Sequence, residues 1–136
     1  MAVDEKIRVF LDEPRFAVLA TINEDGTCQQ TVMWYKLRGD QILLNTARGR
    51  KKDRNLLRDT RISICVEDGY RYVTVAGVAE LVGDQAIAQA DIKELAIRYH
   101  GAEQGEMMAR NQFEKEERIT ILLPADGVDA HGFEDG

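Results

Sequence analysis

The chain has 136 residues, of which 44% are hydrophobic and 31% charged, and its formal net charge is -6. This length and composition predict one globular domain, residues 1–136, with a hydrophobic core of its own. The acidic balance argues against general nucleic-acid binding, because proteins that bind a phosphate backbone usually carry net positive charge.

The chain also lacks the sequence signals of export and membrane insertion. Its first six residues are polar and acidic, unlike a secretory signal, and no apolar run approaches the roughly 18 residues of a membrane span. We therefore expect a cytoplasmic protein in which the two cysteines, Cys28 and Cys65, are reduced, buried and structural. Neither cysteine has a His or Cys neighbour at metal-ligand spacing, so no metal site is predicted.

The first half of the chain predicts one helix followed by short strands. An apolar face over residues 4–12, with Asp4 as N-cap and Pro14 beyond, indicates a helix. Asp25-Gly26 is a strong hairpin signal between two strand-like runs. The predicted strands span 16–22, 28–37 and 41–46.

The second half adds a short helix, 50–58, and then strands at 61–66, 70–82 and 118–123. Gly77, inside the long strand 70–82, indicates a bulge or sharp bend. A regular apolar pattern predicts a helix from the N-cap Asp84 to about residue 100, a shorter helix follows within 102–116, and no regular element is assigned to 125–136. The chain is therefore predicted to be α+β and mainly antiparallel, with six strands closed into a small split barrel and flanked by helices.

A cluster of cations where a strand ends and a helix begins is the clearest functional signal. Five of the 18 Lys and Arg lie between positions 48 and 54. The helix macrodipole disfavours cations at a helix N-terminus unless an anion is present, and backbone N–H groups there bind phosphate readily. A solvated helix face is the simpler explanation. Because the cations follow Thr46 and Gly49, a phosphate site is an equally good explanation of the cluster.

The remaining candidates carry no acid–base or nucleophilic machinery. Trp34 is the only tryptophan and follows polar residues on its strand, so it is either a core aromatic or one wall of a site for a planar ligand. His100 and His131 have no Ser or Cys partner, and no catalytic residue can be assigned. An anion site beside a polar and aromatic strand, without catalytic side chains, fits a protein that positions a phosphorylated, planar redox cofactor.

These residues resemble those of the split-barrel flavin and deazaflavin oxidoreductases related to pyridoxamine 5'-phosphate oxidase. The resemblance extends from about residue 5 to 123 and is closest to the branch that uses coenzyme F420, a deazaflavin. Cys28, Val32 and Thr60 stand where relatives often have proline. Three stretches carry the resemblance: Glu13 to Thr21 with Thr31-Val32-Met33-Trp34-Tyr35; Asn45-Thr46 through Gly49-Arg50-Lys51-Lys52-Asp53-Arg54-Asn55-Leu56 to Arg61; and Tyr70-Arg71-Tyr72-Val73 leading to Gly77.

The resemblance implies a homodimer with two cofactor sites at its interface and a small-molecule substrate. Arg50 and Lys52 are the implied phosphate ligands, assisted by Thr46, and the backbone of Val32, Met33 and Trp34 borders the cofactor ring. Tyr72 and His131 are candidates contributed by the partner subunit. Asn45, Lys51 and Asn55, in the same matched stretch, complete the candidate cofactor-binding residues.

The identity of the cofactor and the reaction stay open at this stage. Arg48, Lys51, Arg54 and Arg58 exceed what one FMN phosphate requires, which favours F420 with its poly-acidic tail and hydride transfer to a small or planar substrate. The alternatives are an FMN-dependent oxidoreductase of the same fold and a non-catalytic protein that binds a flavin, haem or tetrapyrrole.

Overall fold

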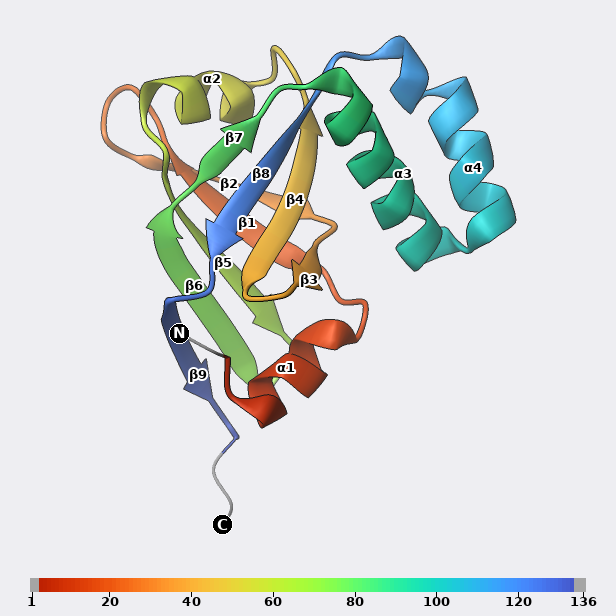
Figure 1. Cartoon of the computed structure of the whole chain (residues 1–136). Helices are drawn as coiled ribbons and strands as arrows, with labels where there is room; N and C mark the ends of the chain where they lie inside the picture. The colour runs from red at the N-terminus through yellow and green to blue at the C-terminus, as the bar shows by residue number, and fades with distance from the viewer. Residues whose placement is uncertain (1–2, 134–136) are drawn as a thin grey trace.

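The computed structural model describes residues 3–133 and contains two antiparallel sheets with helices at their ends and on one side (Figure 1). One sheet has five strands in the order β2-β1-β5-β6-β9, and the other has four in the order β3-β4-β8-β7. The strands are β1 (Ala17–Ile22), β2 (Cys28–Met33), β3 (Lys36–Arg38), β4 (Gln41–Ala47), β5 (Arg61–Glu67), β6 (Tyr72–Val78), β7 (Glu80–Val82), β8 (Arg118–Pro124) and β9 (Gly127–His131). The helices are α1 (Glu5–Asp12), α2 (Lys51–Arg58), α3 (Gln85–His100), α4 (Ala102–Asn111) and the short 3-10 turn η1 (Phe113–Lys115).

The helix boundaries follow from capping chemistry. The Asp4 carboxylate accepts a hydrogen bond from the Lys6 amide at the start of α1. The Asp84 carboxylate does the same for Ala86, at 2.9 Å, at the start of α3. Gly101 ends α3 with φ of 88°, a left-handed conformation that favours glycine, and its backbone also begins α4. This one glycine therefore turns the chain between two helices that pack on each other.

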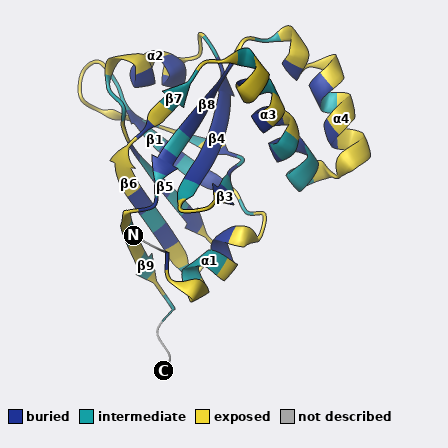
Figure 2. Cartoon of the chain, in the orientation of Figure 1, coloured by how far each residue is buried: buried dark blue, intermediate teal, exposed yellow. Residues whose placement is uncertain are grey.

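The main core lies between the two sheets. β1, β5 and β6 bury alternate residues toward β4 and β8, as expected for strands with one face on a core. Figure 2 shows β4 and β8 buried along most of their length, because α3 packs against their other side. The second, smaller cluster joins this side of the sheet to α3 and α4 and contains Leu43, Ile92, Leu95, Ala96, Ala109 and Phe113.

Two predicted strands are interrupted in the structure. The predicted strand 28–37 is broken at Trp34 and Tyr35, where the Tyr35 amide donates to the Tyr99 hydroxyl at 3.1 Å instead of to a strand. The predicted strand 70–82 passes from one sheet to the other at Ala79, whose amide donates to the Thr60 carbonyl at 2.8 Å. The bend expected at Gly77 therefore falls two residues later.

The predicted six-stranded closed barrel is wrong in its count and its closure. The ladders within residues 3–133 form two separate sheets with nine strands between them. The additional strands are the two created by the interruptions and β9, which was assigned no structure and pairs with β6 from Tyr72↔His131 to Ala76↔Gly127. Residues 134–136 of the tail lie outside the described residues.

The prediction that both cysteines are buried is wrong. Cys28, at the start of β2, is exposed, and Cys65 on β5 is partly exposed.

Candidate functional site

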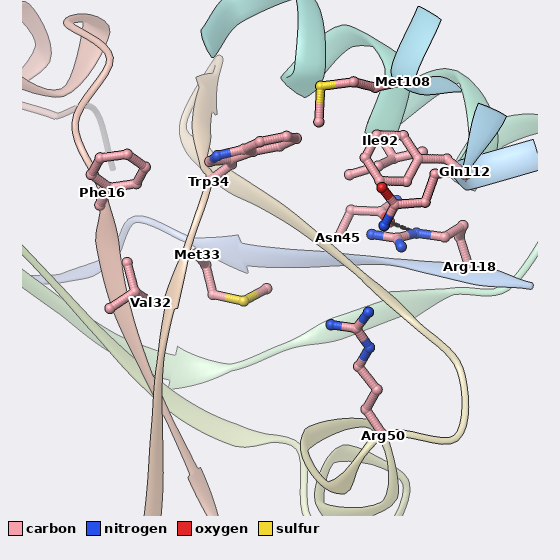
Figure 3. Close-up of a pocket in the computed structure, with 11 residues that line it drawn as sticks. Phe16, Val32, Met33, Trp34, Asn45, Arg50, Ile92, Met108, Gln112 and Arg118 are labelled. Carbon is pink, nitrogen blue, oxygen red and sulfur yellow. Dashed lines mark hydrogen bonds between the residues drawn. The ribbon is translucent and has the colours of Figure 1, made fainter. Parts of the chain in front are cut away.

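A cleft of about 320 Å³ opens where the end of β2, the start of α2 and the α3–α4 pair approach one another. Figure 3 shows the Arg50 side chain entering it from one side, opposite Asn45 and Arg118, with Trp34 and Met108 further along. The lining residues come from segments far apart in the chain: Phe16, Val32, Met33, Trp34, Asn45, Arg50, Ile92, Met108, Gln112, Phe113 and Arg118.

The N-terminus of α2 faces this cleft with its cap unfilled. Arg50 is the N-cap residue, and its side chain makes no capping hydrogen bond. The Asp53 carboxylate turns back and accepts from the Gly49 amide at 2.7 Å, which fixes the loop before the helix. Gly49 has φ of 88°, so the tight entry into the helix needs a glycine there. The amides of the first helical turn are thereby presented with their positive dipole end at the cleft.

Three cations form a cluster here: Arg50 and Arg118 line this end of the cleft, and Lys52 is buried near them. Burial lowers the pKa of Lys52 below its ordinary value, and the charges of Arg50 and Arg118 lower it further. Burial also lowers the pKa of Arg118; its bond with Glu116 opposes that shift and the Arg50 charge adds to it. Within residues 3–133, Arg50 and Lys52 have no ion-pair or hydrogen-bond partner for their side chains. The electrostatics of the cluster would therefore stabilise a bound anion.

Arg118 is the most precisely held member of the cluster. Its Nε donates to Asn45 Oδ1 at 2.9 Å, and its Nη1 donates to Glu116 Oε1 at 2.7 Å. Asn45 in turn donates from Nδ2 to the Ala88 carbonyl at 2.9 Å and to Thr120 Oγ1 at 3.2 Å. Asn45 is 5% exposed and Arg118 is 5% exposed, so this geometry is set inside the protein.

The other end of the cleft is apolar and aromatic. Trp34 stacks on Tyr99, with ring centroids 5.5 Å apart and planes 13° apart, and meets Phe113 edge to face at 6.2 Å. Phe16 stacks on the opposite side of Tyr99 and is 58% exposed. Trp34 therefore serves both as a packed aromatic and as a wall of the cleft, which combines the two interpretations offered by the sequence.

The structure brings five of the ten predicted cofactor-binding residues to the cleft. They are Asn45, Arg50, Val32, Met33 and Trp34. The other five lie elsewhere or behind the lining: Thr46 and Lys52 are buried; Asn55 is buried and donates to Thr21 and Asn23; Lys51 lines a separate hollow beside Asn23 and Asp25; and Tyr72 stacks on His131 on the β6–β9 pair.

Six lining residues were not predicted to belong to a site. Ile92, Met108, Gln112 and Phe113 looked like ordinary core or helix-surface residues, because only the packing of α3 and α4 brings them to the cleft. Phe16 was predicted only as the first residue of the strand 16–22. Arg118 had one readable signal, since it is a cation at the first position of an apolar strand. Its pairing with Ala47 at the end of β4 places it beside the basic cluster.

Among residues 3–133, no group of three or more His, Cys, Asp or Glu side chains is placed to hold a metal ion. None of the helices in this part of the chain is long and apolar enough to cross a membrane.

Comparison with known proteins assigns the fold to a family. The family model described as pyridoxamine 5'-phosphate oxidase matches residues 3–121, so the chain belongs to that family. The structure is similar to that of the conserved hypothetical protein Rv2991 from Mycobacterium tuberculosis, with a TM-score of 0.81 and 26% identity, covering 100% of this chain and 93% of the other.

Two further solved structures are similar over nearly the whole chain. An F420 reductase superimposes with a TM-score of 0.75 and 26% identity, covering 93% of this chain and 98% of the other. The haem storage protein HutZ from Vibrio cholerae has a TM-score of 0.70 at 18% identity, covering 98% of this chain and 97% of the other. At that identity the likeness to HutZ concerns the fold alone.

Proposed function

We propose that this protein is an oxidoreductase that binds a flavin-type cofactor in the cleft, with the cofactor phosphate at Arg50, Lys52 and Arg118. The observation that carries the proposal is the cation cluster. Burial and the charges of Arg50 and Arg118 lower the pKa of Lys52, and burial and the Arg50 charge lower that of Arg118. Such a cluster beside a helix N-terminus suits a polyanionic ligand. The family match and the likeness to an F420 reductase support the same reading.

The chemistry of the lining residues fits such a group at both ends. Charged and amide side chains suit a phosphate, and the stacked rings with Val32 and Met33 suit the face and edge of a planar ring system. A flavin-type cofactor, when bound, supplies hydride transfer, and the protein's part is to hold it and exclude water. No Asp, Glu or His lines the cleft among residues 3–133, so we expect protons to come from solvent or substrate.

We favour coenzyme F420 over FMN, on partly different grounds from those the sequence suggested. Three of the surplus cations bond to the protein itself: Arg48 to Asp53, Arg54 to the Gly49 carbonyl and Arg58 to the Ile22 carbonyl. The number of these cations is therefore weaker evidence for a poly-acidic ligand than the sequence suggested. Arg118 adds a cation that the sequence did not assign, and the 26% identity to an F420 reductase favours the deazaflavin.

Parallel titration of FMN and F420 into the purified protein, followed by absorbance and fluorescence, tests this proposal. Retention of one cofactor and not the other identifies it. Arg50→Ala and Lys52→Ala are each expected to weaken binding by about 1.5–3 kcal/mol, the value of a lost charge-assisted hydrogen bond. Lys93→Ala is the matched control, because Lys93 is a half-exposed cation on α3 outside the cleft. Affinity that is unchanged in both cluster variants rules out this site.

A non-catalytic carrier is the second candidate, favoured by the absence of acid–base residues from the lining described above. The fold shared with a haem storage protein makes the comparison necessary. The two functions differ in turnover: an oxidoreductase passes electrons from its reduced, bound cofactor to added acceptors such as quinones, and a carrier does not.

We also propose that the active form is a homodimer.

A further inference from the structure

A buried chain of hydrogen bonds runs from α3 through both central strands of the four-stranded sheet to the cleft. Asp91 on α3 accepts from the Thr120 hydroxyl at 2.7 Å, and Thr120 accepts from Asn45 Nδ2 at 3.2 Å. Asn45 Oδ1 then accepts from Arg118 Nε at 2.9 Å. Asp91 is 5% exposed and Thr120 1%, so the chain is sealed from water until it reaches Arg118.

The chemistry of Asp91 sets the direction of every bond in this chain. An ionised carboxylate can only accept, so the single hydroxyl proton of Thr120 must point to Asp91. The hydroxyl oxygen is then available only as an acceptor, which requires the nitrogen of the Asn45 amide to face it. The Ala88 carbonyl, at 2.9 Å from the same nitrogen, imposes the same orientation. The Asn45 oxygen is therefore directed at Arg118.

Arg38 is the cationic partner of the Asp91 carboxylate. Arg38 Nη2 donates to the other carboxylate oxygen of Asp91 at 2.9 Å and to Glu94 at 3.0 Å. Both oxygens of this buried carboxylate therefore have a partner. Asp91 does not line the cleft, so its effect there passes through Thr120 and Asn45.

At the far end of the chain the Arg118 guanidinium is left with one unused terminal group. Nε is taken by Asn45 and Nη1 by Glu116, whereas Nη2 makes no hydrogen bond within residues 3–133. Figure 3 shows this guanidinium in the cleft, with that of Arg50 turned toward it. We infer that Arg118 is a third ligand of the cofactor phosphate and that Asp91, Thr120 and Asn45 are positioning residues that aim it. This inference rests on the proposed function for the identity of the anion.

The first test needs no cofactor, because it observes the Arg118 Nε–H by nuclear magnetic resonance. Arg118→Lys identifies the signal by removing it. In the wild-type protein we expect a slowly exchanging Nε–H that shifts on addition of inorganic phosphate. Thr120→Val, which keeps the shape of the side chain and removes the hydroxyl, is expected to speed exchange and abolish the shift. Thr120→Ser, which keeps the hydroxyl, is expected to restore both.

The second test compares FMN with riboflavin, which lacks the phosphate. The ratio of their dissociation constants measures the contribution of the phosphate alone. Thr120→Val is expected to reduce this ratio by a factor of about 5 to 10, as one misaligned charge-assisted hydrogen bond would, and Thr120→Ser to leave it nearly unchanged. A loss of general packing would weaken both ligands equally and leave the ratio as it was.

The outcomes separate this inference from the proposed function. A wild-type protein that binds no flavin-type cofactor overturns the proposed function, while the Arg118 signal still decides whether the chain aims the guanidinium at an anion. A folded Thr120→Val protein with an unchanged Nε–H signal, or with FMN and riboflavin weakened alike, overturns the inference. If Thr120→Val does not fold, Asp91→Asn replaces it. Arg38 and Thr120 both donate to Asp91, so in either orientation the NH₂ group of the new amide faces one of these two donors.

Discussion

Lys52 is a buried cation whose charge is unfavourable in the ligand-free protein. It is 7% exposed, and burial, Arg50 and Arg118 together lower its pKa from the ordinary 10.5. A lysine whose pKa falls on folding holds its proton less tightly in the folded state than in the unfolded one. Stability therefore rises with pH through the window between the lowered pKa and 10.5, and the charged form is unfavourable below it.

Removing the Lys52 charge should therefore stabilise the ligand-free protein. We expect Lys52→Met, which keeps the length of the side chain, to raise the free energy of unfolding of the ligand-free protein by about 0.5–2 kcal/mol and to flatten its dependence on pH between 7 and 10. Urea denaturation across that range is the measurement. Lys93→Met, at a half-exposed position, should change stability by less than about 0.5 kcal/mol. A destabilised Lys52→Met protein would show that the cation cluster is not strained without an anion.

At this scale the sequence predicted part of the cleft lining. The basic cluster was recognisable because a helix N-terminus and its cations are adjacent in the chain, and the family resemblance singled out Arg50, which lines the cleft, and Lys52, which does not. Arg118 could not be singled out, because its place in the cleft depends on the pairing of β8 with β4, which sets it opposite Ala47. Polar residues such as Asp91 and Thr120 carry no local signal at all, since their partners lie on other elements.

At the scale of elements, α4 forms the wall of the cleft, and its position depends on Gly105. A Cβ built on this glycine lies 2.6 Å from the Ile97 amide nitrogen and 2.7 Å from the Ile97 Cα. Backbone atoms of α3 cannot move aside as a flexible side chain can, so the close crossing of the two helices requires glycine. Met108, on the same helix, and Phe113, just beyond it, line the cleft. A side chain at position 105 would therefore displace α4 and, with it, these residues of the cleft lining.

Gly105→Ala is expected to destabilise the protein by about 1–3 kcal/mol, the usual result of forcing an extra carbon into a packed contact. The released α4 should also weaken binding of the cofactor ring, measured as riboflavin affinity, which does not depend on the phosphate. Gln104→Ala, on the adjacent exposed position, is the control and should change neither quantity. Stability equal to that of the control would mean that α4 can shift along α3 without loss.

The element boundaries show which parts of a fold can be read from local sequence. The capped helices and the strands with alternating burial were predicted closely, because Asp84, Gly101 and the apolar periodicity act locally. The interruption at Tyr35 could not be predicted, because it depends on the Tyr99 hydroxyl from α3. Gly77 has a different role from the predicted bend: a Cβ there would lie 3.3 Å from Leu123 Cδ1, so it permits close approach of the two sheets.

At the scale of the whole molecule, the five-stranded sheet has one face in the core and one directed away from it. The register aligns the outward residues of neighbouring strands in rows, such as Ala20, Ser63 and Ala76 across β1, β5 and β6. The small side chains of Ala20 and Ala76, with the exposed Val32 (68%) and Val78 (62%), give the middle of this face apolar surface. Val32 also lines the cleft, so a partner on this face would lie next to the cofactor site.

We expect a second copy of the chain to cover this face and to bring its Tyr72 and His131 to the cleft. Ala20→Arg places a long cation at the centre of the face and should convert a dimer to a monomer in analytical ultracentrifugation, because a buried, unpaired charge is costly. Val9→Arg, on an exposed position of α1, is the matched control and should leave the dimer intact.

Cofactor titration of the same two proteins then reports whether the site needs both subunits. The Ala20→Arg monomer should bind weakly although its Arg50, Lys52 and Arg118 are unchanged. A wild-type monomer that binds the cofactor in full would instead place the whole site within one chain.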